Sequence, residues 1–484
     1  MSNIRFVPTS DIDSATLTSS DFLSTLPVTN LQTEGRSRVA RTSNATGAKS
    51  ILGDFAGATS CAAMVLYGHN ISNAGIWRLR LYSGAGQTSA SNHTNLLLYS
   101  GDLRNTAEAG STRPWTQSDD TGNAVLVAQV AGAAPDAVSA ASKLQANTVG
   151  LLKRSALQTF AVADNADVTV SVYAKAAEVG FLNLAVGTKD NTPLFPSVLF
   201  DLAASSVAAT YASGAAIPAG AIEAVGGGWY RCSVSVNIRS GSSTPMVAFL
   251  LKGNASNADF TSTATGQGLL LWGAQAEVGV MTGYVATTSA TVTEPLPVYD
   301  SGFSSPVGIA GWGTFAWGVE PWGSFMAADW EQAFWTSFFG PVLALSFRLD
   351  LADPSNAAGY IQAKRLLIGS VFEPAANAAY GASLAWGTNS QQARTLGGSL
   401  RTDRRSRFRV LRLTLPGLSA ADRTRWLNLT RVAGVHGELF VSVFPGVGSE
   451  QERDYALLAK FTTPPETVYP GPAYWSSPIN LQEV

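Results

Sequence analysis

Residues 269–293, LLLWGAQAEVGVMTGYVATTSATVT, decide the fold class of this chain. The apolar first half predicts a β-strand, and the glycines and threonines that follow predict turns. A second stretch, residues 226–238 with the sequence GGGWYRCSVSVNI, predicts a strand that begins directly after a glycine turn. Two strands of this kind, each bounded by turn residues, indicate a β-sandwich.

Both stretches carry short motifs. The first contains W-G-A-Q-x-E-x-G at residues 272–279, followed by T-x-Y at residues 282–284, and the second contains G-W-Y-R at residues 228–231. With these motifs, residues 113–293 resemble a carbohydrate-binding-module-like jelly roll that occurs in many phage tail and other virion proteins. The resemblance implies a fold and a virion setting more directly than it implies a ligand.

A second resemblance surrounds the first. Residues 61–67, CAAMVLY, are continuously apolar and predict a strand buried on both faces. Residues 75–82, GIWRLRLY, alternate, which places Arg78 and Arg80 on the face opposite Trp77 and Leu79. This block resembles the front half of a discoidin-like (galactose-binding-like) jelly roll of phage structural proteins, and residues 345–349 and 359–369 resemble its closing strands.

These resemblances lead to a domain hypothesis. The expected fold class is mainly β, with multiple β-sandwich (jelly-roll) domains and a small α+β C-terminal region. Residues 1–112 and 294–375 would form the discoidin-like sandwich, with residues 113–293 inserted in it as the carbohydrate-binding-module-like sandwich. Insertion at an exposed loop is tolerated when the two ends of the insert lie close together. The hypothesis requires strand 61–67 to share a sheet or core with residues 345–349 or 361–368.

Residues 376–461 predict the α+β region. Ser419 is the expected N-cap of a helix that Gly434 ends, with a buried stripe at Trp426, Leu427, Thr430 and Val432. Residues 401–412, which hold six arginines, are interpreted as a subunit-interface or solvated strand rather than a phosphate site. Residues 462–484 are rich in proline and predict an extended tail, lying on a neighbouring subunit or disordered, that cannot join a central sheet.

Three tryptophans recur five residues apart, each followed by glycine, at Trp312, Trp317 and Trp322. Five residues match neither the helix nor the strand period, so we expect turns with the rings packed in a core or interface. Carbohydrate stacking on exposed rings is the alternative.

Composition excludes several classes of protein. The chain of 484 residues has 32 Lys and Arg against 34 Asp and Glu, a net charge of −2, which argues against a nucleic-acid binder. Charged residues make up 14%, compared with about 25% in ordinary soluble domains, which suits surfaces buried against other subunits. No apolar run long enough to span a membrane occurs, and no secretory signal is evident. The two cysteines fit folding in a reducing cytoplasm.

Strand parity suggests a binding face. In residues 168–175 and 229–238 one face is apolar, and the other carries Tyr173 and Lys175 on one strand and Trp229 and Arg231 on the other. A flat aromatic ring beside polar groups suits a sugar, so these four residues are the candidate carbohydrate-binding residues. The alternative is that this face is solvated or covered by a loop. Trp272, in an apolar run, is expected in the core.

No catalytic pattern appears. The three histidines are widely separated, and no H-E-x-x-H, G-x-S-x-G or P-loop motif occurs, so we expect no enzyme and no cofactor. Residues 164–167, Asp-Asn-Ala-Asp, could hold a structural calcium ion, but the pattern favours a plain turn.

The sequence therefore predicts a structural component of a tailed-phage tail tip or baseplate, folded in the bacterial cytoplasm and located in the virion tail. The expected partners are other tail or baseplate proteins and further copies of the chain, with host-surface glycan as an additional ligand. One alternative is a receptor-binding adhesin that acts through the inserted module and presents Trp229 and Tyr173 on an exposed face. A polysaccharide depolymerase with accessory binding modules is a more remote alternative.

Overall fold

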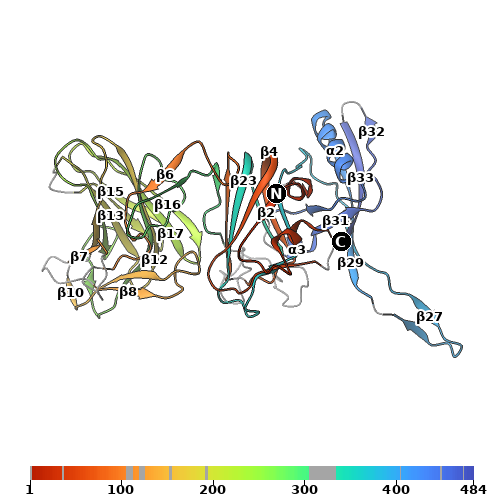
Figure 1. Cartoon of the computed structure of the whole chain (residues 1–484), viewed down its shortest axis with the longest axis horizontal. Helices are drawn as coiled ribbons and strands as arrows, with labels where there is room; N and C mark the ends of the chain where they lie inside the picture. The colour runs from red at the N-terminus through yellow and green to blue at the C-terminus, as the bar shows by residue number, and fades with distance from the viewer. Residues whose placement is uncertain are drawn as a thin grey trace.

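The computed structural model describes the chain apart from residues 1–2, 35–37, 73, 105–112, 119–125, 152–154, 191–194, 305–333, 404, 447–449 and 472–473. The chain is mainly β, as the sequence predicts. Figure 1 shows three β-rich units in a row, with a long hairpin projecting from the C-terminal one. The Trp-Gly repeat lies outside the described residues. Among the described helices, none combines the length and the apolar character needed to cross a membrane.

The central unit is organised around two long antiparallel strands, β4 (Lys49–Tyr67) and β23 (Phe334–Ala352). β25 (Arg365–Gly369) pairs with the end of β4, from Ala63 to Tyr67. The pairings that the insertion hypothesis requires are therefore present, although the inserted unit separates these strands in sequence. The other elements of this unit are α1 (Ser10–Asp13), β2 (Thr16–Thr18), the 3-10 helix η1 (Val28–Gln32), β3 (Ala40–Arg41), β5 (Ile76–Tyr82), β22 (Tyr299–Asp300) and β24 (Gln362–Ala363).

β5 shows the alternation expected from its sequence. Trp77, Leu79 and Leu81 pack in the core of the central unit. The opposite face carries Arg78 and Arg80, and both are buried, because the chain that leaves the inserted unit covers them. This arginine face therefore becomes a contact between two units.

The inserted unit is a sandwich of two six-stranded antiparallel sheets with an apolar core between them. One sheet runs β15 (Ser206–Tyr211), β14 (Ser197–Asp201), β13 (Phe181–Gly187), β18 (Met246–Lys252), β11 (Ser155–Thr159), β7 (Thr116–Ser118). The other runs β16 (Ala219–Gly226), β17 (Trp229–Asn237), β12 (Asp167–Ala176), β20 (Gly268–Val278), β9 (Ala141–Gln145), β8 (Leu126–Val130). A further short pair joins β10 (Gly150–Leu151) and β19 (Thr261–Ser262).

The inserted unit starts earlier than the sequence predicts. Its entry strand β6 (Asn92–Asn95) pairs with its exit strand β21 (Val292–Pro295), so the two ends of the insert lie side by side. Leu97 and Leu103 are buried in the sandwich core, which moves the border back from residue 112 to about the start of β6. The apolar run at residues 96–98 belongs to this core rather than to the central unit.

The C-terminal unit contains a seven-stranded sheet to which the N-terminal strand also contributes. The sheet runs β1 (Arg5–Pro8), β30 (Leu439–Ser442), β31 (Ala456–Phe461), β33 (Tyr474–Glu483), β29 (Arg407–Leu418), β26 (Ser383–Thr388), and β32 (Val468–Gly471) also pairs with β33. Its helices are α2 (Ala420–Ala433) and α3 (Glu450–Asp454). The antiparallel pair β27 (Gln392–Arg394) and β28 (Leu400–Thr402) forms the outer part of the projecting hairpin.

The prediction of a free proline-rich tail is wrong. β33 lies inside the sheet, between β31 and β29. Pro478 is tolerated because of the register on the edge of β33 opposite β29. On this edge β31 pairs with Leu481–Glu483 and β32 pairs with residues before Ser477. Pro478 therefore lies in the gap between these two paired strands. The missing N–H of proline therefore removes no ladder hydrogen bond on that side.

The predicted helix start is confirmed. Ser419 is the N-cap of α2, and its hydroxyl accepts a hydrogen bond from the Asp422 backbone N–H at 3.1 Å. Only part of the predicted buried stripe is correct, because Trp426 is fully buried whereas Leu427 and Val432 are exposed. α2 contacts the sheet along a narrow strip, so residues on either side of Trp426 remain in solvent.

Candidate functional site

The structure brings the four predicted carbohydrate-binding residues together. Tyr173 pairs with Arg231, and Lys175 pairs with Trp229, in the antiparallel register of β12 and β17. All four lie on the sheet face opposite the sandwich core, as strand parity predicts, because the alternate residues of both strands fill that core.

This face is not an exposed aromatic platform. Tyr173 is 2% exposed, Trp229 is 4% exposed and Arg231 is 7% exposed. The Trp229 indole donates a hydrogen bond to the Ala133 carbonyl at 3.1 Å, and the Lys175 ammonium donates to the Gly227 carbonyl at 2.7 Å. The exposed face that the adhesin alternative requires at Tyr173 and Trp229 is therefore absent. The reason is that chain from outside the sheet folds over it.

The W-G-A-Q motif builds this cover. Gly273, with φ +64°, marks the point where the register between β20 and β12 shifts. Beyond it, the Gln275 side chain accepts a hydrogen bond from the Val285 backbone N–H at 2.8 Å, and the Glu277 carboxylate accepts one from the Thr282 N–H at 2.8 Å. These bonds turn the chain back over the sheet.

Tyr284 then seals the covered face. Its ring packs on Trp272 with centroids 4.6 Å apart, and its hydroxyl hydrogen-bonds the Ser100 hydroxyl at 2.7 Å. Trp272, expected in the core, is buried in this second, smaller cluster together with Tyr173 and Trp229. The spacing of this motif thus has a structural explanation within this chain.

Arg78, held by an ion pair within the central unit, also bonds the inserted unit. The Arg78 guanidinium donates to both carboxylate oxygens of Asp300, at 3.0 and 2.6 Å, and to the Tyr284 carbonyl at 3.1 Å. Burial by itself would raise the pKa of Asp300, but the charge and hydrogen bonds of Arg78 outweigh burial and lower it. Asp300 is therefore ionised and fully paired, which makes it unsuitable as an acid or base.

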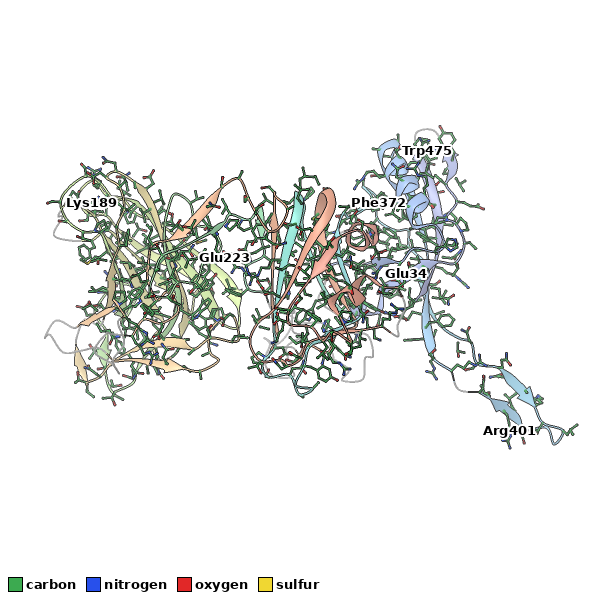
Figure 2. The ribbon with its side chains drawn as sticks, viewed as in Figure 1. Glu34, Lys189, Glu223, Phe372, Arg401 and Trp475 are labelled. Carbon is green, nitrogen blue, oxygen red and sulfur yellow. The ribbon has the colours of Figure 1, made fainter. Side chains whose placement is uncertain are left out.

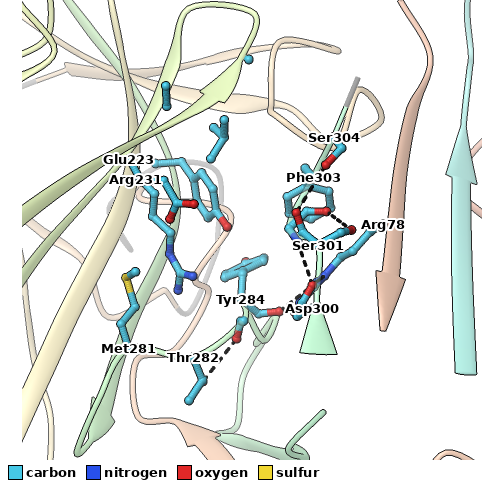
Figure 3. Close-up of a pocket in the computed structure, with 16 residues that line it drawn as sticks. Arg78, Glu223, Arg231, Met281, Thr282, Tyr284, Asp300, Ser301, Phe303 and Ser304 are labelled. Carbon is cyan, nitrogen blue, oxygen red and sulfur yellow. Dashed lines mark hydrogen bonds and ion pairs between the residues drawn. The ribbon is translucent and has the colours of Figure 1, made fainter. Parts of the chain in front are cut away.

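A pocket of about 450 Å³ opens between the covered face and the central unit. Figure 3 shows Arg231 and Met281 on one side and Ser301, Phe303 and Ser304 on the other, with Tyr284 and the Arg78–Asp300 pair at one end. Of the four predicted residues, Tyr173 and Arg231 line this pocket, whereas Lys175 and Trp229 do not. The lining comprises Arg78, Tyr173, residues 223–226, Arg231, residues 281–284 and residues 300–304.

Two donors in this pocket lack partners. Arg231 donates through Nη2 to the Ser171 hydroxyl at 3.1 Å, but its buried Nε has no hydrogen-bond partner. The Tyr173 hydroxyl makes no hydrogen bond within the part of the chain that the structure describes. Burial raises the pKa of Tyr173, with Arg231 and Arg78 opposing the rise, so the hydroxyl keeps its proton at neutral pH.

The sequence did not predict the part of this pocket that the central unit contributes. Arg78, Asp300 and Phe303 reach it from residues outside the predicted module, and no spacing in the sequence links them to Arg231. The available signal was the arginine face of β5, because two arginines alternating with apolar residues require acceptors wherever that face is covered.

The other predicted features are structural. Residues 164–167 form a turn in which Asp164 pairs with Lys189 and Asp167 accepts a hydrogen bond from Asn237. Within the described ranges, no three His, Cys, Asp or Glu side chains are grouped as metal ligands. Cys61 and Cys232 are buried free thiols, and burial raises the pKa of both.

The projecting hairpin is a second candidate surface. β27 and β28 pair only with each other, and the side chains of both strands are exposed. Figure 2 shows Arg401 near the end of this hairpin, far from the sheets. Leu396 at the turn and Leu400 on β28 are apolar and exposed. We call residues 389–406 the arm.

No protein-family model matches the sequence, and no curated protein matches it. Among solved structures, the chain is similar to the enzymatically active domain of tailspike protein 4 of bacteriophage CBA120, with 12% sequence identity and a TM-score of 0.25. The match covers 38% of this chain and 21% of the tailspike chain, so this chain spans about a fifth of that protein. At this TM-score the similarity carries no argument about fold or activity.

Proposed function

We propose that this chain is a structural subunit of a phage tail tip or baseplate, located in the virion tail, and that it acts by binding copies of itself and other virion proteins rather than by catalysis. The observation that carries the proposal is the arm. A two-stranded hairpin is marginally stable in water unless its side chains pack against something. Leu396 and Leu400 of the arm are 112% and 54% exposed, so the described residues cover little of these side chains.

The chemistry of the arm suits a protein partner. Its exposed leucines lie among arginines, and Arg394 and Arg405 make only local contacts, with the Gly398 carbonyl and the Asp403 carboxylate. Arginine is enriched in protein–protein interfaces, and the cores of such interfaces are apolar. The strand edges of the arm add unpaired backbone groups that a neighbouring sheet would satisfy.

Self-association tests the proposal. The double variant Leu396→Glu/Leu400→Glu removes the apolar side chains and is expected to convert an oligomer into a monomer in sedimentation velocity, with an unchanged melting temperature. The control is Leu427→Glu, which alters an exposed leucine of α2 and should leave the oligomer intact. A monomeric wild-type protein at micromolar concentration, or an oligomer that survives the double substitution, contradicts assembly through the arm.

A receptor-binding adhesin that acts through the pocket, instead of through an exposed face at Tyr173 and Trp229, is a second candidate. Its lining includes Arg231, whose Nε has no hydrogen-bond partner, and Tyr173, whose hydroxyl makes no hydrogen bond within the described residues. The depolymerase alternative requires a pair of free carboxylates, and Asp300 in the pocket wall is held by Arg78. Turnover of host capsule or lipopolysaccharide by the purified chain would favour that alternative.

A further inference from the structure

The pocket holds a buried guanidinium with an unfilled hydrogen-bonding position. Arg231 is 7% exposed and its Nε has no partner, while Nη2 reaches Ser171. A buried donor without an acceptor is costly, and the cost is greater for a charged group. Nε is enclosed by protein atoms, but an acceptor atom that entered the pocket would bond Nη1, which makes no hydrogen bond within the described residues, and would offset part of this penalty.

Charge indicates which acceptor fits. Arg78 and Asp300 neutralise each other across two short hydrogen bonds. Glu223 lies opposite Arg231 in the register of β16 and β17, but it is exposed and makes no ion pair within the described residues. Within the described residues, the buried Arg231 charge therefore has no ion-pair partner, and its guanidinium carbon lies 5.4 Å from the centroid of the Tyr173 ring. A carboxylate binds guanidinium with a planar, two-bond geometry that no neutral group matches.

The remaining walls suit the body of a sugar. Val225, Met281 and Phe303 supply apolar surface for the C–H face of a ring, and the Tyr173 hydroxyl offers a donor and an acceptor for ring hydroxyls. A volume of about 450 Å³ lies within the range of pockets that hold small ligands. An apolar wall beside a few polar groups is the arrangement by which proteins orient small ligands.

We propose that this pocket binds the carboxylate-bearing unit of an acidic saccharide. Arg231 holds the carboxylate, and Tyr173 and Glu223 hydrogen-bond ring hydroxyls. The ligand contacts both the inserted unit and residues 300–304, so the site exists only where the two units meet. It does not involve the arm, and it goes beyond the assembly role proposed above.

Saturation-transfer NMR and calorimetry on the full chain test the proposal. The probes are glucuronate, galacturonate and N-acetylneuraminate, with glucose, galactose and sodium acetate as comparisons. At least one sugar acid is expected to bind saturably and about tenfold or more tightly than its neutral counterpart, because a charge-assisted hydrogen-bond pair supplies the difference. Acetate is expected to bind more weakly than the sugar acid, since it lacks the ring.

Three variants separate the contributions. Arg231→Met is expected to weaken sugar-acid binding about tenfold or more, whereas Arg412→Met, at an exposed arginine of β29, leaves it unchanged. Tyr173→Phe removes only a hydroxyl without a partner, so it preserves the fold and weakens binding several-fold. Glu223→Gln removes repulsion and is expected to tighten binding of the acid but not of the neutral sugar.

The outcomes are distinct from those of the assembly test, which measures sedimentation. Binding of a sugar acid that depends on Arg231 and Tyr173 supports the proposal. Equal binding of neutral sugars overturns the role of the carboxylate, equal binding of acetate overturns the role of the saccharide, and no binding by any sugar acid overturns the site. If Arg231→Met fails to fold, Tyr173→Phe and Glu223→Gln decide the same question.

Discussion

Removing Arg78 is predicted to loosen the inserted unit from the central one. Arg78 and Asp300 have side chains that are only 8% and 12% exposed, and they share two hydrogen bonds, at 3.0 and 2.6 Å. In Arg78→Met the Asp300 carboxylate loses both hydrogen bonds from Arg78. It still accepts the one from the Gly302 backbone N–H, at 2.9 Å. The Tyr284 carbonyl also loses a donor.

The expected magnitude follows from this burial. Breaking a buried ion pair by removing one partner costs about 3–5 kcal/mol, because the remaining charge stays desolvated. The matched control is Arg348→Met on β23, where the arginine side chain is 41% exposed and pairs with Asp350. Arg348 is largely solvated and Asp350 keeps its bond from Arg80, so this change is expected to cost only about 0–1 kcal/mol. The double variant Arg78→Met/Asp300→Leu should lose less than the sum of its two single variants, since no charge remains buried.

Hydrogen exchange followed by mass spectrometry measures this effect in the segment concerned. Amides of residues 281–304 should exchange faster in Arg78→Met than in wild type, while amides of β29 and β33 in the C-terminal unit remain unchanged. Exchange is preferred to a single melting curve because a chain of several units does not unfold in one step. Unchanged protection of residues 281–304, or an equal effect from Arg348→Met, would refute the reasoning.

Two further predictions concern stability. Burial lowers the pKa of His69 from 6.5 to about 4, and Asp353 opposes this shift. Between these two pH values the unfolded chain therefore binds a proton that the folded chain does not. The contribution of His69 to the free energy of unfolding should be complete above about pH 6.5 and fall by about 3 kcal/mol as the pH drops to 4. Urea titrations across this range should show a flatter profile for His69→Gln than for His436→Gln at an exposed histidine, and identical profiles would contradict the assignment. Gly273→Ala should destabilise the inserted unit by about 1–3 kcal/mol, because φ is +64° and a Cβ would lie 2.9 Å from the Tyr173 ring. The control for thermal unfolding is Gly266→Ala, where φ is also positive but nothing lies within 4 Å of the added Cβ. An equal loss of stability in both variants would show that the ring contact contributes nothing.

Local sequence patterns predicted the structure correctly where the alternation of residues along one strand, or a single capping side chain, determines it. Strand parity placed Tyr173 and Arg231 on the outer face of adjacent strands, and the Ser419 cap fixed the start of α2. The proline-rich tail failed for the opposite reason. Whether Pro478 is tolerated depends on which neighbouring strands pair beside it, and that register involves β31 and β32 rather than the tail itself.

The sequence by itself determined the fold class, because alternation of apolar and polar residues is a property of each strand alone. Only the tertiary structure decided that the polar face of β12 and β17 is covered, and that it ends in a pocket rather than a platform. The cover is formed by Tyr284 and Phe303, which lie far along the chain from Tyr173. A contact of that kind depends on how the two units meet, where Arg78, paired with Asp300 in the central unit, also bonds the Tyr284 carbonyl of the inserted unit. The sequence of a single strand does not specify it.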